Sequence, residues 1–258
     1  MDFDIYEFNS KTIVDEILDC VSNNKKTIFF GLNADCFNIS MVNLKYHKIL
    51  QNEKYYIYPD GMSIVWANKY LNKIRQNRIV TTDLILYLLK KLTQEKNKIT
   101  ITFLGGDKGI AELAKNQLNK RYSINSIQNA FEPTVLTLDE VDNPNGKNVS
   151  GLIQYLNDHP TDILFVGLGC PKQEILCNNI LPFIPQKVLF PCGGLFSYYA
   201  DEHARAPVWM QQIGLEWLFR LMLEPKRLWK RYLIGNFIFI YQVVKRKYFF
   251  HTSEILFS

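Results

Sequence analysis

The segment YPDGMSIVWA, residues 58–67, places Asp60 where an apolar run gives way to an amphipathic one. Aspartate at such a strand-to-helix junction often caps the helix, and with Gly61 it often forms a turn. The same carboxylate at the ligand-binding edge of a sheet can act as a general base. Asp60 is therefore a candidate for both roles, and the local sequence alone favours the cap.

Glycines follow three other apolar runs, at Gly105, Gly106, Gly167, Gly169, Gly193 and Gly194. In an open parallel sheet, ligands bind beyond the carboxyl ends of the strands. Glycine there lets the backbone approach a ligand, and the N-terminus of the next helix favours a phosphate. One such group is an ordinary turn, whereas three in one chain indicate a nucleotide or another phosphorylated ligand.

The most specific local motif is GLGCPKQE, residues 167–174. Pro171 suits the first position of a helix, so Lys172 and Gln173 would project from its first turn. A lysine in the first turn opposes the helix dipole. An anion bound at this turn, such as a diphosphate, would explain it.

Three further polar residues flank the predicted strand ends. Asn33 and Asp35, in GLNADCFN, can hydrogen-bond a sugar or simply close a turn. Arg78, in RIVTTDL, precedes a helix that Thr82 or Asp83 would cap. It can pair with a phosphate or, more commonly for a surface arginine, with an acid.

The last fifth of the chain carries all the excess positive charge. Residues 205–258 hold nine Lys or Arg and three Glu, and also 12 of the 35 aromatic residues. On an ideal helix Arg220, Arg227 and Arg231 would share a face, although Pro225 interrupts it. The uncharged run Tyr232–Val244 suits an interfacial or a packed helix. The segment either faces something anionic and partly apolar or is an ordinary basic surface helix.

These residues need a scaffold, and short apolar runs that alternate with amphipathic stretches predict a mainly parallel sheet with helices on both faces. The expected strands are Thr27–Leu32, Tyr55–Tyr58, Ile99–Leu104, Ile124–Gln128, Ile163–Val166 and Val188–Phe190. The expected helices are Thr12–Ser22, Met62–Asn72, Thr82–Gln94, Gly109–Lys120, Val149–Asn157, Lys172–Ile180, Trp209–Leu223 and Lys226–Val244. A long surface loop is expected over Glu132–Ser150.

The composition is that of a globular protein, with 258 residues, 47% hydrophobic and 21% charged. No apolar run approaches the roughly 20 residues of a membrane span. The acidic N-terminus does not resemble a signal peptide, and five cysteines without a CxxC pair indicate reduced thiols in a cytoplasmic protein. The four histidines are scattered, and Asp2-Phe3-Asp4 lies before any strand, so we expect no metal and no cofactor.

Several motifs in order resemble the WecG/TagA/CpsF glycosyltransferases, which include N-acetylmannosaminyltransferases of wall teichoic acid and enterobacterial common antigen synthesis. The matching pieces are GLNADCFN, YPDGMSIVWA, RIVTTDL, FLGGDKGIAE, DILFVGLGCPKQE, PCGG and RAPVWMQQIGLEWLFRLMLEPKRLWKRYL. They extend from about residue 28 to 233. The resemblance implies a Rossmann-like core over residues 1–204 and a helical appendage over residues 205–258.

The resemblance also implies an activity and its residues. Family members are inverting, metal-independent enzymes that move a sugar from a UDP-sugar to a polyprenyl-diphosphate-linked sugar in the cytoplasmic leaflet. The proposed base corresponds to Asp60. The other corresponding positions, which would bind substrate, are Asn33, Arg78, Gln173, Arg220, Arg227 and Arg231. The appendage would complete the site at the anionic inner face of the membrane.

The chain departs from the family pattern in two places. Gly31 stands where the family usually has Thr, and GGLFSYYAD has Ser197 for Asp and Asp201 for Gly. The donor sugar is therefore open: N-acetylmannosamine, a related hexose, or glucose in capsule or exopolysaccharide assembly. The oligomeric state is open too, and a homo-oligomer is compatible with the sequence.

Two other functional classes fit the sequence less well. A dinucleotide-dependent oxidoreductase would need a GxGxxG motif in the first strand–helix unit, and none occurs there. A nucleic-acid-binding module would fit the basic aromatic tail, but the remainder of the chain is neutral and carries no such motif.

Overall fold

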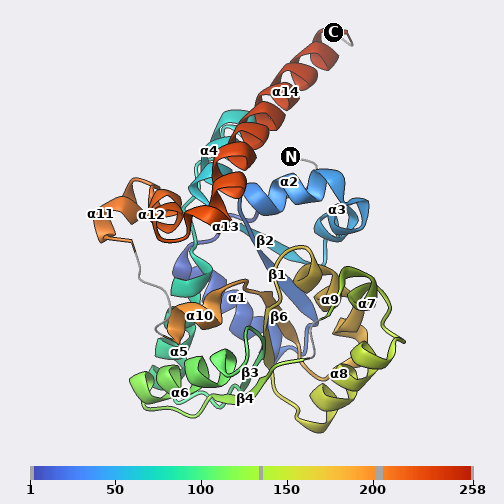
Figure 1. Cartoon of the computed structure of the whole chain (residues 1–258), viewed down its shortest axis with the longest axis vertical. Coiled ribbons are helices and arrows are strands. Elements are labelled where there is room, and N and C mark those ends of the chain that lie inside the picture. The colour runs from blue at the N-terminus through green and yellow to red at the C-terminus, as the bar shows by residue number, and fades with distance from the viewer. Residues whose placement is uncertain (1–2, 134–135, 201–205, 257–258) are drawn as a thin grey trace.

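The computed structural model describes residues 3–133, 136–200 and 206–256 and is built around one open sheet (Figure 1). Its strands run in the order β2-β1-β6-β5-β3-β4, and every neighbouring pair is parallel. Their bounds are β1 Thr27–Leu32, β2 Tyr56–Pro59, β3 Ile101–Gly105, β4 Ile127–Phe131, β5 Ile163–Gly167 and β6 Val188–Pro191. The predicted α/β class with a parallel sheet is confirmed.

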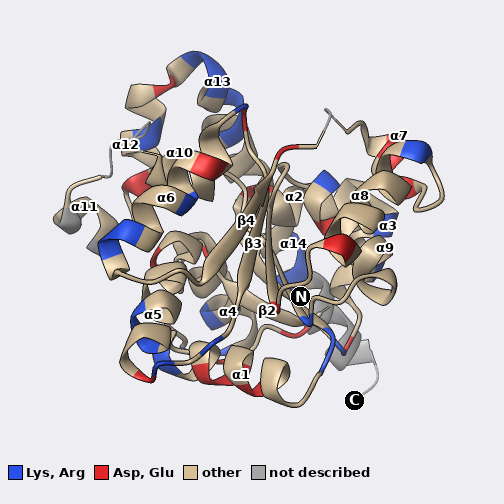
Figure 2. Cartoon of the chain, turned by 90° about the horizontal axis from the view of Figure 1, so that it is seen from below, with Lys and Arg blue, Asp and Glu red and all other residues tan. Residues whose placement is uncertain are grey.

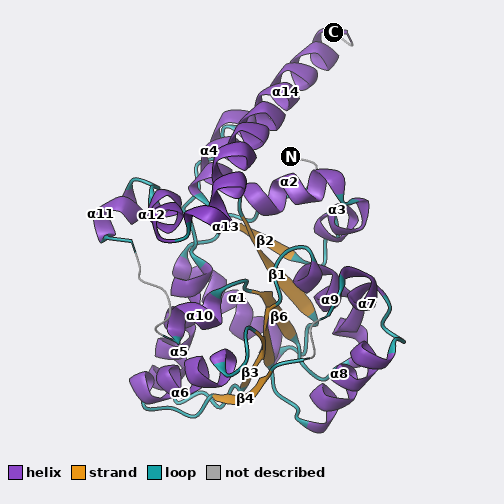
Figure 3. Cartoon of the chain, viewed as in Figure 1, coloured by secondary structure: helices purple, strands orange, loops and turns teal. Residues whose placement is uncertain are grey.

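Helices cover both faces of the sheet (Figures 2 and 3), because the central strands are apolar on both sides and buried almost throughout. One face carries α1 (Ser10–Ser22), α5 (Thr81–Gln94), α6 (Ile110–Tyr122) and α10 (Leu195–Tyr199). The other carries α2 (Ala34–Val42), α3 (Leu44–Leu50), α7 (Leu138–Asp142), α8 (Lys147–Asp158), α9 (Lys172–Ile180) and the 3₁₀ turn η1 (Leu181–Phe183). Helix α4 (Met62–Asn72) follows β2 and packs Ile64 and Ala67 into this second core.

The prediction of a surface loop over Glu132–Ser150 is wrong in part. The segment contains α7 and the start of α8. Thr137 and Glu140 form a capping box at the start of α7, and Val141 is fully buried. Proline, asparagine and glycine mark only the turn between the two helices. Helices α2, α3 and α10 were likewise not expected.

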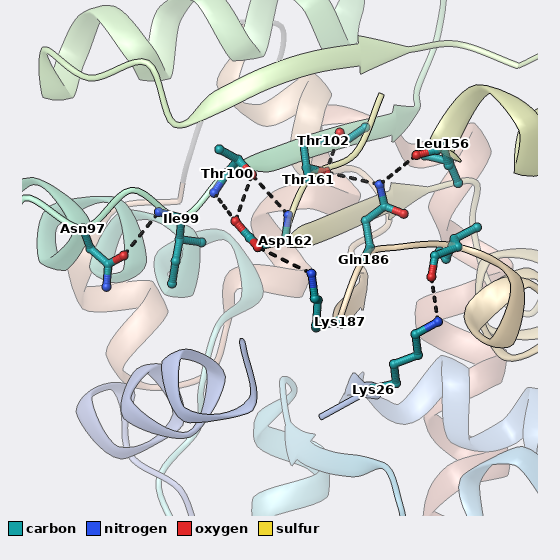
Figure 4. Close-up of polar contacts among 11 residues, drawn as sticks. Lys26, Asn97, Ile99, Thr100, Thr102, Leu156, Thr161, Asp162, Gln186 and Lys187 are labelled. Carbon is teal, nitrogen blue, oxygen red and sulfur yellow. Dashed lines mark hydrogen bonds and ion pairs between the residues drawn. The ribbon is translucent and has the colours of Figure 1, made fainter. Parts of the chain in front are cut away.

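Polar side chains fix the amino ends of the strands, opposite the predicted ligand edge (Figure 4). The Asp162 carboxylate accepts hydrogen bonds from the backbone N–H and the hydroxyl of Thr100, both at 2.9 Å. The fully buried amide of Gln186 donates to the Thr161 hydroxyl at 3.3 Å. These bonds join β3, β5 and β6 where they begin, so the strands reach the opposite edge in a fixed register.

The C-terminal segment forms several helices where two were expected. They are α11 (Val208–Gln212), α12 (Glu216–Leu223), α13 (Pro225–Trp229), the π-helical turn η2 (Lys230–Ile234) and α14 (Gly235–Leu256). Helix α14 extends away from the sheet and lies along α2 and α4 (Figure 1). Because the chain leaves helical geometry at Glu224, between α12 and α13, Arg220 does not share a continuous helix with Arg227 and Arg231, and the ideal-helix face expected for the three arginines does not exist. The expected domain boundary at residue 204 falls outside the described residues.

Candidate active site

The parallel sheet brings the predicted residues to a single edge. Asp60 follows β2 and Asn33 follows the neighbouring β1. The glycine turns at residues 193–194, 167–169 and 105–106 follow β6, β5 and β3, which are the next strands in order. Carboxyl edges of open parallel sheets are where ligands bind. The candidate site is therefore a row of strand ends that begins at Asp60.

The Asp60 side chain caps a helix, but not the expected one. The N-cap of α4 is Gly61, whereas Oδ1 of Asp60 accepts a hydrogen bond from the backbone N–H of Thr81, the first residue of α5, at 2.9 Å. Thr82 and Asp83 therefore do not cap α5 as expected; its N-cap is Val80. Asp60 thus ties the end of β2 to the positive end of α5.

Asp60 is partly buried and lies among charged groups. Burial raises the pKa of its carboxyl, while the Arg78 guanidinium, the Thr81 N–H and Arg220 lower it and Glu216 raises it. A carboxyl whose pKa is raised by burial remains a stronger base when it ionises. Asp60 therefore has the chemistry of a general base as well as that of a cap.

Arg78 lies directly beside Asp60. Its Nε donates to the Asp60 carbonyl oxygen at 2.8 Å, and its Nη2 donates to Glu216 at 2.7 Å. The other oxygen of Glu216 accepts from Arg220 Nη2 at 3.1 Å. Glu216 was not predicted as a site residue, because it is 138 positions from Arg78 and no spacing rule links them.

Asn33 is the N-cap of α2, so its amide oxygen is already engaged. That oxygen accepts from the backbone N–H groups of Asp35 and Cys36 at 3.0 and 3.1 Å. Asp35 in turn pairs with Arg231 Nε at 3.0 Å. This pair brings Arg231 from η2 to the start of α2, just after the end of β1. Arg227 is not brought there; it pairs with Glu224 on its own segment and is 62% exposed.

Gly31 lacks the hydroxyl of the threonine that the family usually has at this position. The hydroxyls of Thr81 and Tyr58 lie beside Gly31 instead. A Cβ on Gly31 would lie 2.8 Å from the Thr81 Oγ1 and 2.9 Å from the Tyr58 hydroxyl, and these two groups share a hydrogen bond of 2.8 Å. Tyr58 is fully buried, and burial followed by the nearby Asp60 charge raises its pKa well above the usual value. Glycine is therefore required at position 31 in this chain, and Tyr58 and Thr81 occupy its surroundings.

The glycine turns divide into packed and open positions. A Cβ on Gly105, whose φ is +103°, would lie 2.6 Å from the carbonyl oxygen of Gly167, so Gly105 allows two turns to touch. By contrast, a Cβ on Gly169, Gly193 or Gly194 would meet no described atom within 4 Å. The turns after β5 and β6 therefore leave room for a ligand near the backbone.

Gln173 holds these turns together. Its side-chain oxygen accepts hydrogen bonds from the backbone N–H groups of Leu168, Gly169 and Gly193 at 3.1–3.3 Å, and the residue is only 5% exposed. Lys172 donates to the Leu136 carbonyl oxygen at 3.0 Å, which gives the unusual first-turn lysine a protein partner. Both residues border the glycine turns, and both have structural bonds there.

Behind the turns lies a buried sulfur–carboxyl cluster that the sequence spacing does not disclose. Ligand atoms of Cys36, Cys170 and Glu174 lie within 4.8 Å of one another. Burial raises the pKa of Glu174 to about 7, and the bond to Cys36 followed by burial raises that of the Cys170 thiol. Such high pKa values favour protonated, uncharged groups near neutral pH.

The outer surface of the C-terminal helices is apolar and basic. Phe237, Tyr241 and Tyr248 of α14 are 75%, 63% and 69% exposed. Phe239 is 5% exposed and packs edge-on against Phe37 of α2, with the ring centroids 5.2 Å apart. Lys and Arg residues occupy much of α13 (Figure 2). No helix within the described ranges combines the length and the apolar character needed to cross a membrane.

Comparison with known proteins identifies relatives over nearly the whole chain. The profile of the glycosyl transferase WecG/TagA/CpsF family matches residues 1–253. Three relatives are each named N-acetylglucosaminyldiphosphoundecaprenol N-acetyl-beta-D-mannosaminyltransferase. The one from Bacillus spizizenii is 26% identical over 87% of this chain and 85% of its own. The one from Bacillus subtilis is 29% identical over 73% and 68%, and the one from Staphylococcus aureus is 26% identical over 83% and 78%.

Proposed function

The chain belongs to the glycosyl transferase WecG/TagA/CpsF family, and we propose that it transfers N-acetylmannosamine or a related hexose from a UDP-sugar to a polyprenyl-diphosphate-linked sugar. The names of the relatives support the acceptor class. The observation that carries the proposal is the cluster of Asp60, Arg78 and Arg220 at the carboxyl edge of the sheet. It places a candidate base beside two cations.

In the proposed reaction Asp60 removes the proton from the acceptor hydroxyl. The hydroxyl oxygen attacks the anomeric carbon of the donor, the bond from that carbon to the phosphate oxygen breaks, and UDP leaves with the electron pair. A single displacement of this kind inverts the anomeric configuration. General-base assistance contributes about 10²–10⁴-fold to such a step.

The departing diphosphate needs positive charge, which we assign to protein groups. Arg78 and Arg220 are held beside Asp60, and Arg231 lies at the end of β1. The open backbone at Gly193 and Gly194 would let the diphosphate approach peptide N–H groups. This assignment needs no metal ion, in keeping with the metal independence that the resemblance implies.

We further propose that the C-terminal helices dock on an anionic membrane surface, where a polyprenyl acceptor would lie. The exposed aromatic side chains of α14 supply apolar contacts, and the exposed basic residues of α13 and η2 supply charge. Each Lys or Arg near an anionic bilayer contributes about 1 kcal/mol, screened by salt. Docking there would bring the acceptor close to Asp60 and to the donor diphosphate that Arg220 and Arg231 contact.

Nucleotide titration by calorimetry tests the donor half of the proposal. UDP is expected to bind the wild-type chain, and Arg220→Gln is expected to weaken binding about 10-fold through loss of a charge-assisted contact. Lys226→Gln is the matched control, because Lys226 is an exposed cation on the neighbouring α13. NAD should not bind. Absence of UDP binding, or equal binding of NAD, would refute the proposal.

A further inference from the structure

Glu216, the first residue of α12, is a buried carboxylate between two arginines. It is 6% exposed, and its two oxygens accept hydrogen bonds from Arg78 at 2.7 Å and from Arg220 at 3.1 Å. A buried carboxylate is stable only when it is well paired and hydrogen-bonded. Each oxygen of this buried acid therefore accepts a hydrogen bond from a different arginine.

The connection continues from Arg78 to the candidate base. While Nη2 of Arg78 contacts Glu216, its Nε donates to the backbone carbonyl of Asp60 at 2.8 Å. The Asp60 carboxylate accepts from the Thr81 N–H at 2.9 Å. Arg78 is a planar guanidinium, so fixing two of its nitrogens fixes its plane. A continuous set of bonds thus leads from the C-terminal helices to Asp60.

We infer that Glu216 is a positioning residue: its carboxylate orients Arg78 and Arg220 beside Asp60 and so couples the placement of the C-terminal helices to the catalytic edge of the core. The inference rests on the proposed function in taking Asp60 as the base. Glu216 itself contacts the two arginines and acts through them.

The arrangement leaves Arg220 able to contact a substrate. Its side chain is 47% exposed, whereas that of Arg78 is 17% exposed. A guanidinium carries five N–H donors, so Arg220 can contact a phosphate oxygen while one nitrogen remains on Glu216. Glu216 would then hold Arg220 in place before the diphosphate arrives, which lowers the entropic cost of binding.

The Glu216 charge also affects the proton affinity of Asp60. The charged groups that act on its carboxyl are Arg78 and Arg220, which lower its pKa, and Glu216, which raises it; the buried Tyr58 hydroxyl lies nearby. Removing the Glu216 charge should therefore lower the pKa of Asp60. Because the base must be ionised, the acid limb of the rate profile should move to lower pH.

The experiment measures the pKa of Asp60 directly by NMR and indirectly through the pH dependence of the rate. The full-length protein is labelled with ¹³C at aspartate carboxyls, and the Asp60 resonance is assigned by its loss in Asp60→Asn. Titration midpoints and pH profiles of kcat/KM are then compared for wild type, Glu216→Gln and Glu216→Asp. Glu224→Gln is the control, since Glu224 pairs with Arg227 on the same group of helices but outside the network.

We expect Glu216→Gln to lower the Asp60 midpoint and to shift the acid limb in the same direction. It should also raise the donor KM about 10-fold, whereas Glu224→Gln should match wild type. Glu216→Asp keeps the charge but is too short to hold both arginines, so the donor KM should rise.

An unchanged donor KM in a folded Glu216→Gln variant overturns the inference. If that variant does not fold, the Asp variant decides, and an unchanged donor KM there overturns it. The NMR midpoint does not depend on turnover. If the wild-type protein transfers no sugar but Asp60 still titrates at a lower pH in Glu216→Gln than in wild type, the proposed function is refuted and the coupling stands.

Discussion

At the scale of single residues, Asp60 combines a structural bond with a chemical role. One carboxylate oxygen holds the N-terminus of α5, and burial raises the pKa of the group. A carboxylate can accept several hydrogen bonds, so the capping bond leaves Asp60 able to accept a proton. Asp60 can therefore be both the cap and the base, because both roles need an acceptor that is fixed at the end of β2.

Asp60→Asn separates the two roles. Asparagine keeps the oxygen that accepts from Thr81 but cannot take a proton, so the fold should persist while turnover falls about 10²–10⁴-fold. Steady-state kinetics and the melting temperature measure the two effects. Near-normal turnover in the folded variant would remove Asp60 from the mechanism.

The raised pKa of Glu174 predicts that the free energy of unfolding depends on pH. Burial raises its pKa from 4.5 to about 7, so between these values the folded state binds a proton that the unfolded state releases. Stability contributed by this group is therefore full below about pH 4.5, falls as the pH rises, and levels off above about pH 7. The loss is on the order of 3 kcal/mol.

The variant Glu174→Gln isolates this contribution, since glutamine is neutral throughout. Urea unfolding from about pH 5 to 8 should show wild type losing free energy of unfolding relative to the variant as the pH rises. A difference between the two proteins that stays constant over this range would show that Glu174 is ionised in the folded state.

At the scale of elements, α14 has two faces with different tasks. Phe239 and Val243 are buried beside α2, whereas Phe237 and Tyr241 point away from the core. The apolar run Tyr232–Val244 is both a packed and a surface segment. Hydropathy alone does not separate these faces, because almost every position in the run is apolar.

A matched pair of variants tests this division. Phe239→Ala should cost on the order of 3 kcal/mol of local stability, because it removes the ring that packs on Phe37. Phe237→Ala should leave unfolding unchanged and weaken co-sedimentation with anionic liposomes. The reverse pattern, with Phe237 stabilising and Phe239 binding lipid, would show that the helix is turned the other way.

The sequence predicts the regular elements better than their interruptions. Alternation of apolar runs predicts the bounds of β1, α4 and α9 correctly, and places β4 three residues early. It misses α10, a single turn whose glycine-rich start resembles a loop. It also misses Glu216, since a contact across 138 positions exists only after the sheet and the C-terminal helices are in place.

At the scale of the whole molecule, a parallel α/β core presents its carboxyl edge to a set of C-terminal helices. The Arg78–Glu216 and Arg231–Asp35 pairs join these two parts next to the candidate base. We propose that the core binds the donor and that the C-terminal helices bring the membrane-borne acceptor to it.

Truncation after Ala204 tests this division of labour. The remaining core should still bind UDP, but more weakly because Arg220 and Arg231 are lost, and it should transfer sugar poorly to a lipid-linked acceptor. Calorimetry and liposome-based transfer assays measure the two properties. Transfer by the truncated core at the full-length rate would show that the C-terminal helices take no part in the reaction.

The central claim is sugar transfer from a UDP-sugar to a polyprenyl-diphosphate acceptor, and a donor screen tests it most directly. The full-length protein is mixed with a synthetic prenyl-diphosphate N-acetylglucosamine and individual UDP-sugars in the presence of EDTA, and the lipid product is identified by mass spectrometry. We predict one added N-acetylhexosamine from UDP-N-acetylmannosamine, and none with Asp60→Asn. Addition of glucose instead would change the donor, while no product from any UDP-sugar, with or without added Mg²⁺ or Mn²⁺, would contradict the claim.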